Sequence, residues 1–301
     1  MRVAAADIGT NSTRLLIADV VGGRLRPLER RVTVTGLGEG VDRNGRLGAA
    51  GVARTLEVLA VYRAAARDAG AAAMRVVATS AVRDAVDRAA FLDRAAEVLG
   101  ARPEVIGGEE EAILSFRGAA GGAVGPPPYL VIDVGGGSTE FVFGVEAPTY
   151  VRSIDMGSRR ATERFLPCHP AGGEALRAAS GAVAEQFAAV DLPAVAGTVL
   201  GVGGTYTALA AIAFDLEAYD PDRVHGSVVL LATLDGMSRH LASLSLEEVA
   251  ALPSLDPARG PVLLGGAIVA AEALRRSGCA EVTVSEADLL DGIARGLVES
   301  G

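Results

Sequence analysis

Apolar and polar positions alternate in blocks along the chain, and the block lengths predict a repeated order of strands and helices. "RVAAADIG" and "TRLLIADV" are apolar runs of strand length that are joined by a polar turn. A helix is expected in "GAAGVARTLEVLAVYRAAARDAG", where apolar residues recur near helical spacing and Gly70 is a typical stop signal. "MRVVATS" and "PEVI" resemble short strands, and "DRAAFLDRAAEVLG" and "GEEEAILSFRGAA" resemble helices. This alternation predicts an α/β fold whose sheet is at least partly parallel.

The segment "AGGAVGPPPY" interrupts this alternation, because its Gly and Pro content suits neither a helix nor a central strand. We therefore expect two domains, 1–124 and 125–301. In the second, we expect the strand "TVLGVGG", the helix "TYTALAAIAF", two short helices over 233–252 and a long helix in "PVLLGGAIVAAEALRRSG". A strand and a helix close the chain, with Ser285 as the expected N-cap and Asp288 in the capping-box position.

One short phrase occurs twice, and each predicted domain contains one copy near its start. "DIGTNSTR" begins at Asp7 and "DVGGGSTE" begins at Asp133, an offset of 126 residues. Each copy consists of an apolar strand, an acidic residue, a turn of small residues and a second strand. The residues that match in register are Asp7 and Asp133, Gly9 and Gly135, Ser12 and Ser138, and Thr13 and Thr139. The match includes the polar turn, where chance similarity of hydrophobic patterns contributes least.

This phrase suits a site for phosphate and a metal ion. Glycine lets the backbone approach an oxyanion and point its N–H groups inward, serine and threonine add hydroxyl donors, and aspartate holds a hard cation such as Mg²⁺. The alternative is an ordinary hairpin turn, but the presence of two copies favours the functional interpretation. A third glycine-rich turn, at Gly203, Gly204 and Thr205, is a further candidate, and its alternative is a tight turn with a capping threonine.

Two other stretches contain candidate reactive groups. "GGEEEA" places three carboxylates at a helix start, where acidic residues also simply favour the helix dipole. Burial of one of them would raise its pKa toward the range of a general base, while the helix N-terminus would lower it, so the sequence leaves this balance open. Arg83 follows a predicted strand end and could bind phosphate through its guanidinium, or could be an exposed helix-start arginine. His225 and Arg259, beside Gly and Pro turns, are weaker candidates.

Composition excludes several classes of protein. The net charge of −9 argues against general nucleic-acid binding. All 28 cationic residues are arginine, so the lysines required by P-loop enzymes, protein kinases and pyridoxal enzymes are absent. The two cysteines have no disulfide-framework or metal-ligand spacing. No apolar run reaches the roughly 20 residues of a membrane helix, and the N-terminus does not resemble a signal peptide, so we expect a cytoplasmic protein.

Taken in order, these motifs resemble the exopolyphosphatase/guanosine pentaphosphate phosphatase (Ppx/GppA) family. That family belongs to the actin, Hsp70 and sugar-kinase superfamily of duplicated ribonuclease-H-like domains. The resemblance covers nearly the whole chain, through "DIGTNSTRLLI", "ATSAVRDA", "IGGEEEAILSF", "VIDVGGGSTEFVFG", "SIDMGSRRATERF", "GVGGTYTALA", "VHG", "LDPARGPVLLGGAI" and "VSEADLLDGI". It implies a fold of two ribonuclease-H-like domains with an interdomain cleft.

The resemblance also implies an activity, which is the Mg²⁺-dependent hydrolysis of a terminal phosphoanhydride, with Mn²⁺ as a substitute metal. By motif position, Asp7, Asp133 and Glu140 are expected to serve the metal and the attacking water. Glu111 is the expected general base, with Glu110 as the fallback. The expected phosphate-binding residues are Arg83 and those of the three turns, namely Gly9, Thr10, Asn11, Ser12, Gly135, Gly136, Gly137, Ser138, Gly203, Gly204 and Thr205.

Several hypotheses about function remain open at this stage. The leading one is an exopolyphosphatase that acts on inorganic polyphosphate. Short polyphosphates are the expected substrates, because longer family members carry an extra C-terminal helical domain that the printed sequence does not reach. The alternative within the family is a guanosine pentaphosphate 5′-phosphatase. More distant alternatives are an ATP-dependent kinase or nucleotide-binding assembly protein of the superfamily, and a protein that senses guanosine tetraphosphate without turnover. The resemblance also allows a homodimer.

Overall fold

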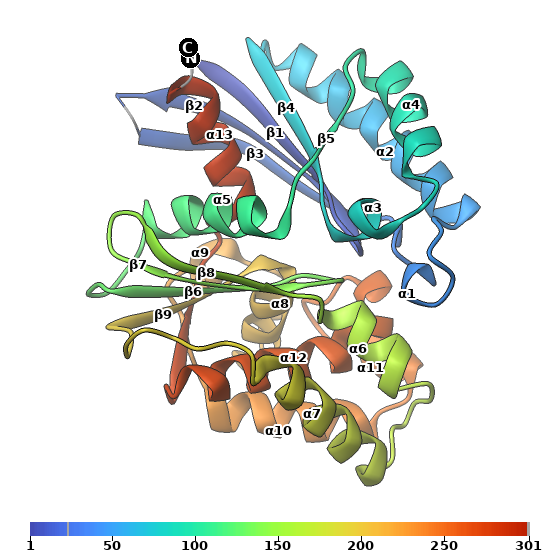
Figure 1. The fold of residues 1–301 in the computed structure, drawn as a ribbon, viewed down its shortest axis with the longest axis vertical. Coiled ribbons are helices and arrows are strands. Elements are labelled where there is room, and N and C mark those ends of the chain that lie inside the picture. The colour runs from blue at the N-terminus through green and yellow to red at the C-terminus, as the bar shows by residue number, and fades with distance from the viewer. Residues whose placement is uncertain (23, 300–301) are drawn as a thin grey trace. The chain divides into compact units, whose positions relative to one another are not determined.

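The structure of the protein is a computed structural model that describes residues 1–22 and 24–299 (Figure 1). The chain forms two compact units. The first unit contains residues 1–118 together with the C-terminal segment that begins at Asp288, and the second contains residues 119–287. Each unit is built around one β-sheet with helices packed against it.

The first unit has a five-stranded sheet in the order β3-β2-β1-β4-β5. β1, β2 and β3 form an antiparallel meander, and β4 and β5 continue the sheet parallel to β1. The strands are β1 (Arg2–Ile8), β2 (Ser12–Val21), β3 (Arg24–Val34), β4 (Ala73–Ala78) and β5 (Glu104–Val105). The helices are α1 (Val41–Asn44), α2 (Ala49–Asp68), α3 (Ser80–Asp84), α4 (Arg88–Leu99), α5 (Gly108–Ala120) and α13 (Leu289–Glu299).

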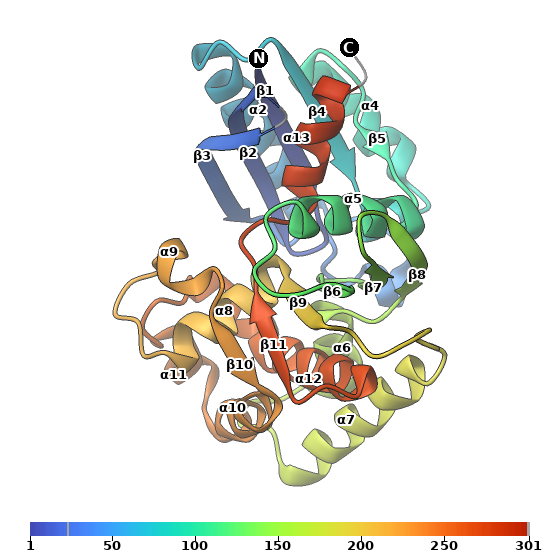
Figure 2. The same ribbon diagram turned by 90° about the vertical axis from the view of Figure 1, so that its left-hand side faces the viewer.

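The twofold periodicity of β1 explains why this sheet is covered on both faces. Ala4 and Ala6 pack with Tyr62 of α2, whereas Val3 and Ala5 pack with Ile293 of α13. Alternate residues of a strand point to opposite faces, so a strand buried on both sides is a nearly continuous apolar run. Figure 2 shows α13 lying across the strands of this sheet.

Helix α13 differs from the sequence-based expectation in two respects. The predicted domain 125–301 included it, but its apolar face packs on β1, β2 and β4, so its contacts assign it to the first unit. Its N-cap is Asp288 and not Ser285. The Asp288 side chain accepts a hydrogen bond from the backbone N–H of Leu290 at 2.9 Å, and Asp291 accepts one from the N–H of Asp288 at 3.0 Å. The arrangement is similar to a capping box, but the Asp288 side chain accepts from the second N–H of the helix and not from the third.

The second unit has a six-stranded sheet in the order β10-β11-β9-β6-β7-β8. β6, β7 and β8 form an antiparallel meander, and β9 and β11 are parallel to β6. The strands are β6 (Tyr129–Val134), β7 (Thr139–Gly144), β8 (Pro148–Ile154), β9 (Thr198–Val202), β10 (Val228–Leu230) and β11 (Glu281–Val284). The helices are α6 (Ser158–Phe165), α7 (Gly173–Phe187), α8 (Gly203–Ala213), α9 (Pro221–Val224), α10 (Leu231–Ser243), α11 (Leu246–Ala250) and α12 (Gly260–Ser277), with a 3₁₀ turn, η1, at Pro257–Arg259.

The core of the second unit lies on one face of its sheet. Leu130, Ile132 and Val134 alternate along β6 and pack into one large apolar cluster with α7, α10 and α12. Helix α12 is buried over most of its length, which explains why its sequence is apolar nearly all round. By the same alternation, Val131 and Asp133 point to the opposite face.

The two units repeat one topology, in which an antiparallel meander of three strands is followed by parallel strands. The predicted α/β fold with two related domains is confirmed in this respect. The repeated phrase falls on the same element in both units, the turn between the first two strands of the meander. None of the described helices is long and apolar enough to cross a membrane.

Candidate active site

The first copy of the phrase forms the turn between β1 and β2. The N–H of Gly9 donates to the carbonyl of Ser12 at 3.1 Å, which closes the turn. The carbonyls of Thr10 and Asn11 accept hydrogen bonds from the segment 35–38, including one from Gly38 at 2.8 Å. The turn is therefore held on both sides by backbone hydrogen bonds. The sequence predicted the turn but not the segment that supports it.

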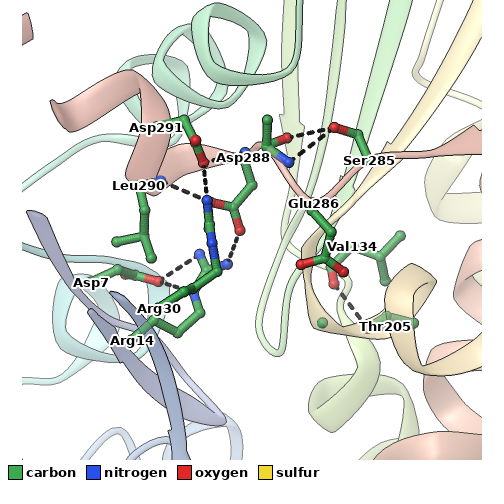
Figure 3. A network of polar contacts seen from close by, with 12 residues as sticks. Asp7, Arg14, Arg30, Val134, Thr205, Ser285, Glu286, Asp288, Leu290 and Asp291 are labelled. Atoms are coloured by element: carbon green, nitrogen blue, oxygen red, sulfur yellow. Dashed lines mark hydrogen bonds and ion pairs between the residues drawn. The ribbon is translucent and has the colours of Figure 1, made fainter. Parts of the chain in front are cut away.

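Asp7 lies at the end of β1 and is 3 % exposed. Its Oδ2 accepts hydrogen bonds from Arg14 Nε at 3.0 Å and Arg14 Nη2 at 2.8 Å (Figure 3). The two residues are direct cross-strand partners in the antiparallel ladder, so their side chains share one face. Asp7 Oδ1 is buried and has no hydrogen-bond partner within the described residues. Burial raises the pKa of Asp7 above its ordinary value, and Arg14 opposes this shift.

The three glutamates at the start of α5 have different environments. Glu111 is buried, and its Oε2 lies 3.2 Å from Arg83 Nη1. Glu110 is half exposed at the surface and pairs with Arg75 at 2.9 Å. Glu109 is exposed. The structure therefore distinguishes Glu111 from its neighbours and places it beside Arg83, a pairing that the sequence did not reveal.

Arg83 and Glu111 meet because of the order of the parallel strands. β1, β4 and β5 are neighbours, so the segments after their carboxyl ends emerge at the same edge of the sheet. Arg83 lies in α3, shortly after β4, and its Nη1 also donates to the carbonyl of Ile106, just after β5, at 3.1 Å. Asp7 is next to last in β1. In open α/β sheets, this edge is where ligands usually bind.

The second copy of the phrase forms the corresponding turn between β6 and β7. The N–H of Gly135 donates to the carbonyl of Ser138 at 3.0 Å, which repeats the bond seen in the first copy. The carbonyls of Gly135 and Gly136 accept hydrogen bonds from the first N–H groups of α6, at 2.9 Å each from Ser158 and Arg159. The motif "SIDMGSRR" therefore supports this turn, a role that the sequence analysis did not assign.

Asp133 and Glu140 are direct cross-strand partners, as Asp7 and Arg14 are in the first unit. Both are buried, with exposed fractions of 6 % and 1 %. Ser153 donates a hydrogen bond to Glu140 Oε1 at 2.8 Å. The two copies of the repeat therefore differ in charge at this position. The first copy has an aspartate–arginine ion pair, and the second has two acidic residues in cross-strand register. Like charges directly across a ladder are destabilising unless a cation or proton accompanies them.

The third glycine-rich segment is the first turn of helix α8, which begins directly after β9, and it packs against the second turn. Gly203 has a φ of +83°, and a Cβ there would lie 2.7 Å from Asp133 Oδ1, so glycine is required for both conformation and space. The Thr205 hydroxyl donates to the carbonyl of Val134 at 2.9 Å (Figure 3). Arg259 donates to the carbonyl of Gly204 at 2.7 Å. The structure therefore brings Gly203, Gly204 and Thr205 together with Asp133.

The two weaker candidates have identifiable contacts within the second unit. Arg259 supports the third turn through Gly204, as described above. His225 follows α9, and its Nδ1 accepts a hydrogen bond from the backbone N–H of Glu286 at 3.2 Å. These contacts give both residues a positioning role at the ends of helices and loops.

The sequence analysis did not predict Arg14 or Asp288 as residues of the site. Arg14 forms an ion pair with Asp288 as well as with Asp7 (Figure 3). The sequence does contain a signal for Arg14, because it follows Asp7 by the seven positions that separate Glu140 from Asp133. Asp288 lies far away in the sequence, and only the packing of α13 on the sheet brings it to Arg14.

Each unit, taken by itself, has carboxylate oxygens of the kind that a hard divalent cation prefers. Asp7 offers a buried carboxylate oxygen without a hydrogen-bond partner in the described chain, and Asp133 and Glu140 offer two adjacent carboxylates. Mg²⁺ prefers oxygen ligands and is commonly held by one or two carboxylates together with substrate phosphates and water. Among residues 1–22 and 24–299, no group of three or more His, Cys, Asp or Glu side chains is arranged to hold a metal ion.

Comparison with known proteins identifies the family. The model of the Ppx/GppA phosphatase family matches residues 16–300. Exopolyphosphatase 2 of Mycobacterium tuberculosis is 42 % identical over 314 aligned residues that cover 98 % of each chain. The phosphatase-containing bifunctional 3-dehydroquinate synthase/phosphatase of Fusobacterium nucleatum is 30 % identical over 96 % of this chain and 45 % of its own length. The chain therefore belongs to the Ppx/GppA phosphatase family, and the prediction of that family is confirmed.

Solved structures agree with this assignment. The crystal structure of an exopolyphosphatase-like protein superposes with a TM-score of 0.93 at 34 % identity, covering 98 % of this chain and 97 % of the other. The Ppx/GppA family member of Aquifex aeolicus gives a TM-score of 0.84 at 30 % identity, covering 100 % and 98 %. The fold and the general enzyme class, a phosphatase, are thus those that the sequence predicted.

Proposed function

We propose that this protein is an exopolyphosphatase that hydrolyses the terminal phosphoanhydride of inorganic polyphosphate and releases orthophosphate. The observation that carries the proposal is the pairing of buried Glu111 with Arg83 at the edge of the first sheet where its parallel strands end. A carboxylate can act as a general base toward water, and a guanidinium can bind phosphate oxygens, so the pair suits hydrolysis of a phosphoanhydride. The 42 % identity to a protein named exopolyphosphatase over nearly its whole length supports the same substrate.

In the proposed reaction, Glu111 takes a proton from the attacking water. The water oxygen forms a bond to the terminal phosphorus, and the bridging P–O bond breaks, so its electron pair leaves with the shortened chain. Arg83 holds Glu111 in place and contributes positive charge beside it. The backbone N–H groups and hydroxyls of the turns 9–12 and 135–138, with the third turn at 203–205, bind the phosphate oxygens.

Asp7, Asp133 and Glu140 are the residues we propose to hold Mg²⁺, with Mn²⁺ as a substitute. When bound, the ion neutralises negative charge on the phosphate oxygens and polarises the phosphorus centre. The carboxylates of Asp133 and Glu140 also orient the attacking water. The unpartnered oxygen of Asp7 supports its inclusion in this set.

The test is phosphate release by the purified protein, measured side by side on a short polyphosphate, a long polyphosphate and guanosine pentaphosphate. We expect kcat/KM to be highest on polyphosphate. The preference for short chains remains a prediction that the first two substrates decide. Higher kcat/KM on guanosine pentaphosphate would instead identify a guanosine pentaphosphate phosphatase with the same chemistry, and release from none of the three would overturn the proposal.

Labelled ATP, with and without sugars, serves as the control for the superfamily alternative. Transfer of the label to a sugar would identify a kinase. The homodimer that the resemblance allows remains a prediction, and light scattering of the same preparation measures it.

A further inference from the structure

A network of three buried aspartates and two partly buried arginines connects Asp7 with the start of α13 in the first unit. Arg14 bridges the carboxylates of Asp7 and Asp288, and Arg30 bridges those of Asp288 and Asp291 (Figure 3). Arg30 Nη2 lies 2.6 Å from Asp291 Oδ2, and its Nη1 lies 3.4 Å from Asp288 Oδ1. The guanidinium of Arg14 is therefore shared between two carboxylates and does not belong to Asp7 alone.

The five charged side chains of this network have a formal net charge of −1. Asp7, Asp288 and Asp291 carry three negative charges, and Arg14 and Arg30 carry two positive charges. Asp288 Oδ1 accepts hydrogen bonds from Leu290 and Arg30, its Oδ2 pairs with Arg14, and Asp291 Oδ2 accepts from Arg30 and from the N–H of Asp288. Asp7 Oδ1 is buried without any hydrogen-bond partner in the described chain. This oxygen of Asp7 therefore remains available to a cation that is not part of the protein.

We propose that Asp288 is a positioning residue for Asp7, and that it acts through Arg14. By binding Arg14, Asp288 keeps that guanidinium on Asp7 Oδ2 and shares its charge, so that Oδ1 retains its affinity for a divalent cation. The proposal rests on the proposed function in one respect, which is that Asp7 is a ligand of the divalent cation. Groups that orient a metal ligand from behind commonly change metal affinity when they are replaced.

Asp288→Asn tests this proposal with little disturbance of the fold. Asparagine is as good an N-cap as aspartate, so the hydrogen bond to Leu290 and the start of α13 are kept. The amide nitrogen would face Arg14 in place of a carboxylate oxygen, which removes the competing partner. Binding of Mn²⁺ alone, measured by electron paramagnetic resonance without substrate, should weaken by about tenfold. Unchanged Mn²⁺ affinity would overturn the proposal.

Two further variants separate positioning from structural damage and from simple charge. Arg30→Gln removes the positive charge at the end of the network that is farther from Asp7. Asp288 then binds Arg14 more strongly, so Mn²⁺ should bind more tightly. Structural damage would instead weaken Mn²⁺ binding in both Asp288→Asn and Arg30→Gln. Weaker or unchanged Mn²⁺ binding in Arg30→Gln therefore counts against the proposal.

In an Arg14→Gln background, Asp288→Asn should have little remaining effect on Mn²⁺ binding. An equal loss in both backgrounds would show that Asp288 acts by its own charge and not through Arg14.

Asp19→Asn is the matched control, because Asp19 forms a comparable pair with Arg2 at 3.0 Å in the same sheet but does not contact Asp7 or Arg14. Its Mn²⁺ affinity should equal that of the wild type. In hydrolysis assays, Asp288→Asn should raise the Mg²⁺ concentration that gives half-maximal rate more than it lowers kcat at saturating Mg²⁺. Because Mn²⁺ binding is measured without substrate, failure of the wild type to hydrolyse polyphosphate would overturn the proposed function and not this inference.

Discussion

At the scale of single residues, the glutamate run of α5 gives the sharpest prediction. Glu111→Gln keeps the shape of the side chain and can still accept a hydrogen bond from Arg83, but it cannot take a proton from water. Loss of a positioned general base should lower kcat by about 10²–10⁴, while KM and the melting temperature change little. Steady-state kinetics on polyphosphate and thermal unfolding of the same preparations measure both quantities.

The same substitution at Glu110 is the control for this prediction. Glu110→Gln removes a half-exposed pair with Arg75, and pairs of this kind contribute about 0–1 kcal/mol to stability. Its kcat should therefore stay near that of the wild type. Loss of kcat in Glu110→Gln with retention in Glu111→Gln would show that the base is one residue earlier.

The residue scale also shows what sequence can and cannot predict about the site. Asp7 and Asp133 were predictable because they precede glycine turns in a repeated phrase. Glu111 could be chosen over Glu110 only through the family resemblance, since burial of one of three adjacent acids depends on which side of α5 packs against the rest of the first unit. The partners Arg14 and Asp288 are 274 positions apart, and no local pattern connects them.

At the scale of elements, the crossing of α5 and α13 gives the next prediction. A Cβ at Gly118 would overlap the carbonyl of Asp288, and a Cβ at Gly292 would overlap that of Leu114. The two helices therefore contact each other backbone to backbone. Gly292→Ala should force them apart and lower the free energy of unfolding by about 1–3 kcal/mol, as overpacking typically does. Urea unfolding followed by circular dichroism measures this change.

Gly296→Ala on the same helix is the matched control, because a Cβ there would meet nothing within 4 Å. Alanine is favoured over glycine inside a helix by about 0.5–1 kcal/mol, so this variant should be as stable as the wild type or more stable. Equal destabilisation by both substitutions would mean that α13 tolerates no change at either glycine, and that the close crossing is not the cause.

Elements differed in how well their sequence predicted them. The helices and buried strands that follow apolar periodicity were expected, including the two short helices α10 and α11. Strand β3 was not, because "RLRPLERRVTV" is rich in charge and contains Pro27. It lies at the edge of its sheet, and charged residues and proline are common on edge strands, where one side of the backbone is unpaired. Only the completed sheet explains this sequence.

At the scale of the whole molecule, the duplication links fold and chemistry. Both units present the phrase on the same turn, but the residue across the ladder is arginine in the first and glutamate in the second. The sequence predicted the repeat, and the aligned copies already place Arg14 and Glu140 at the same position. Only the register of the strands shows that these residues lie directly across from Asp7 and Asp133. The boundary near the Gly- and Pro-rich segment was expected, but the return of α13 to the first unit was not, because helix packing between distant segments leaves no local signal.

The last prediction concerns Mg²⁺ and the stability of the whole chain. Asp133 and Glu140 are buried carboxylates in direct cross-strand register in a protein of net charge −9, so a divalent cation that binds them should stabilise the folded state. Binding to the native state alone contributes about 2.7 kcal/mol when the free ion is at 100 times its Kd. Mg²⁺ should therefore raise the melting temperature of chelator-treated protein and restore the hydrolysis that the chelator abolishes. Asp133→Asn should lose most of this rise, whereas Asp235→Asn, which breaks a surface pair with Arg275, should keep it. Full activity in excess chelator, or an equal rise in both variants, would contradict the assignment of Asp133 to the metal.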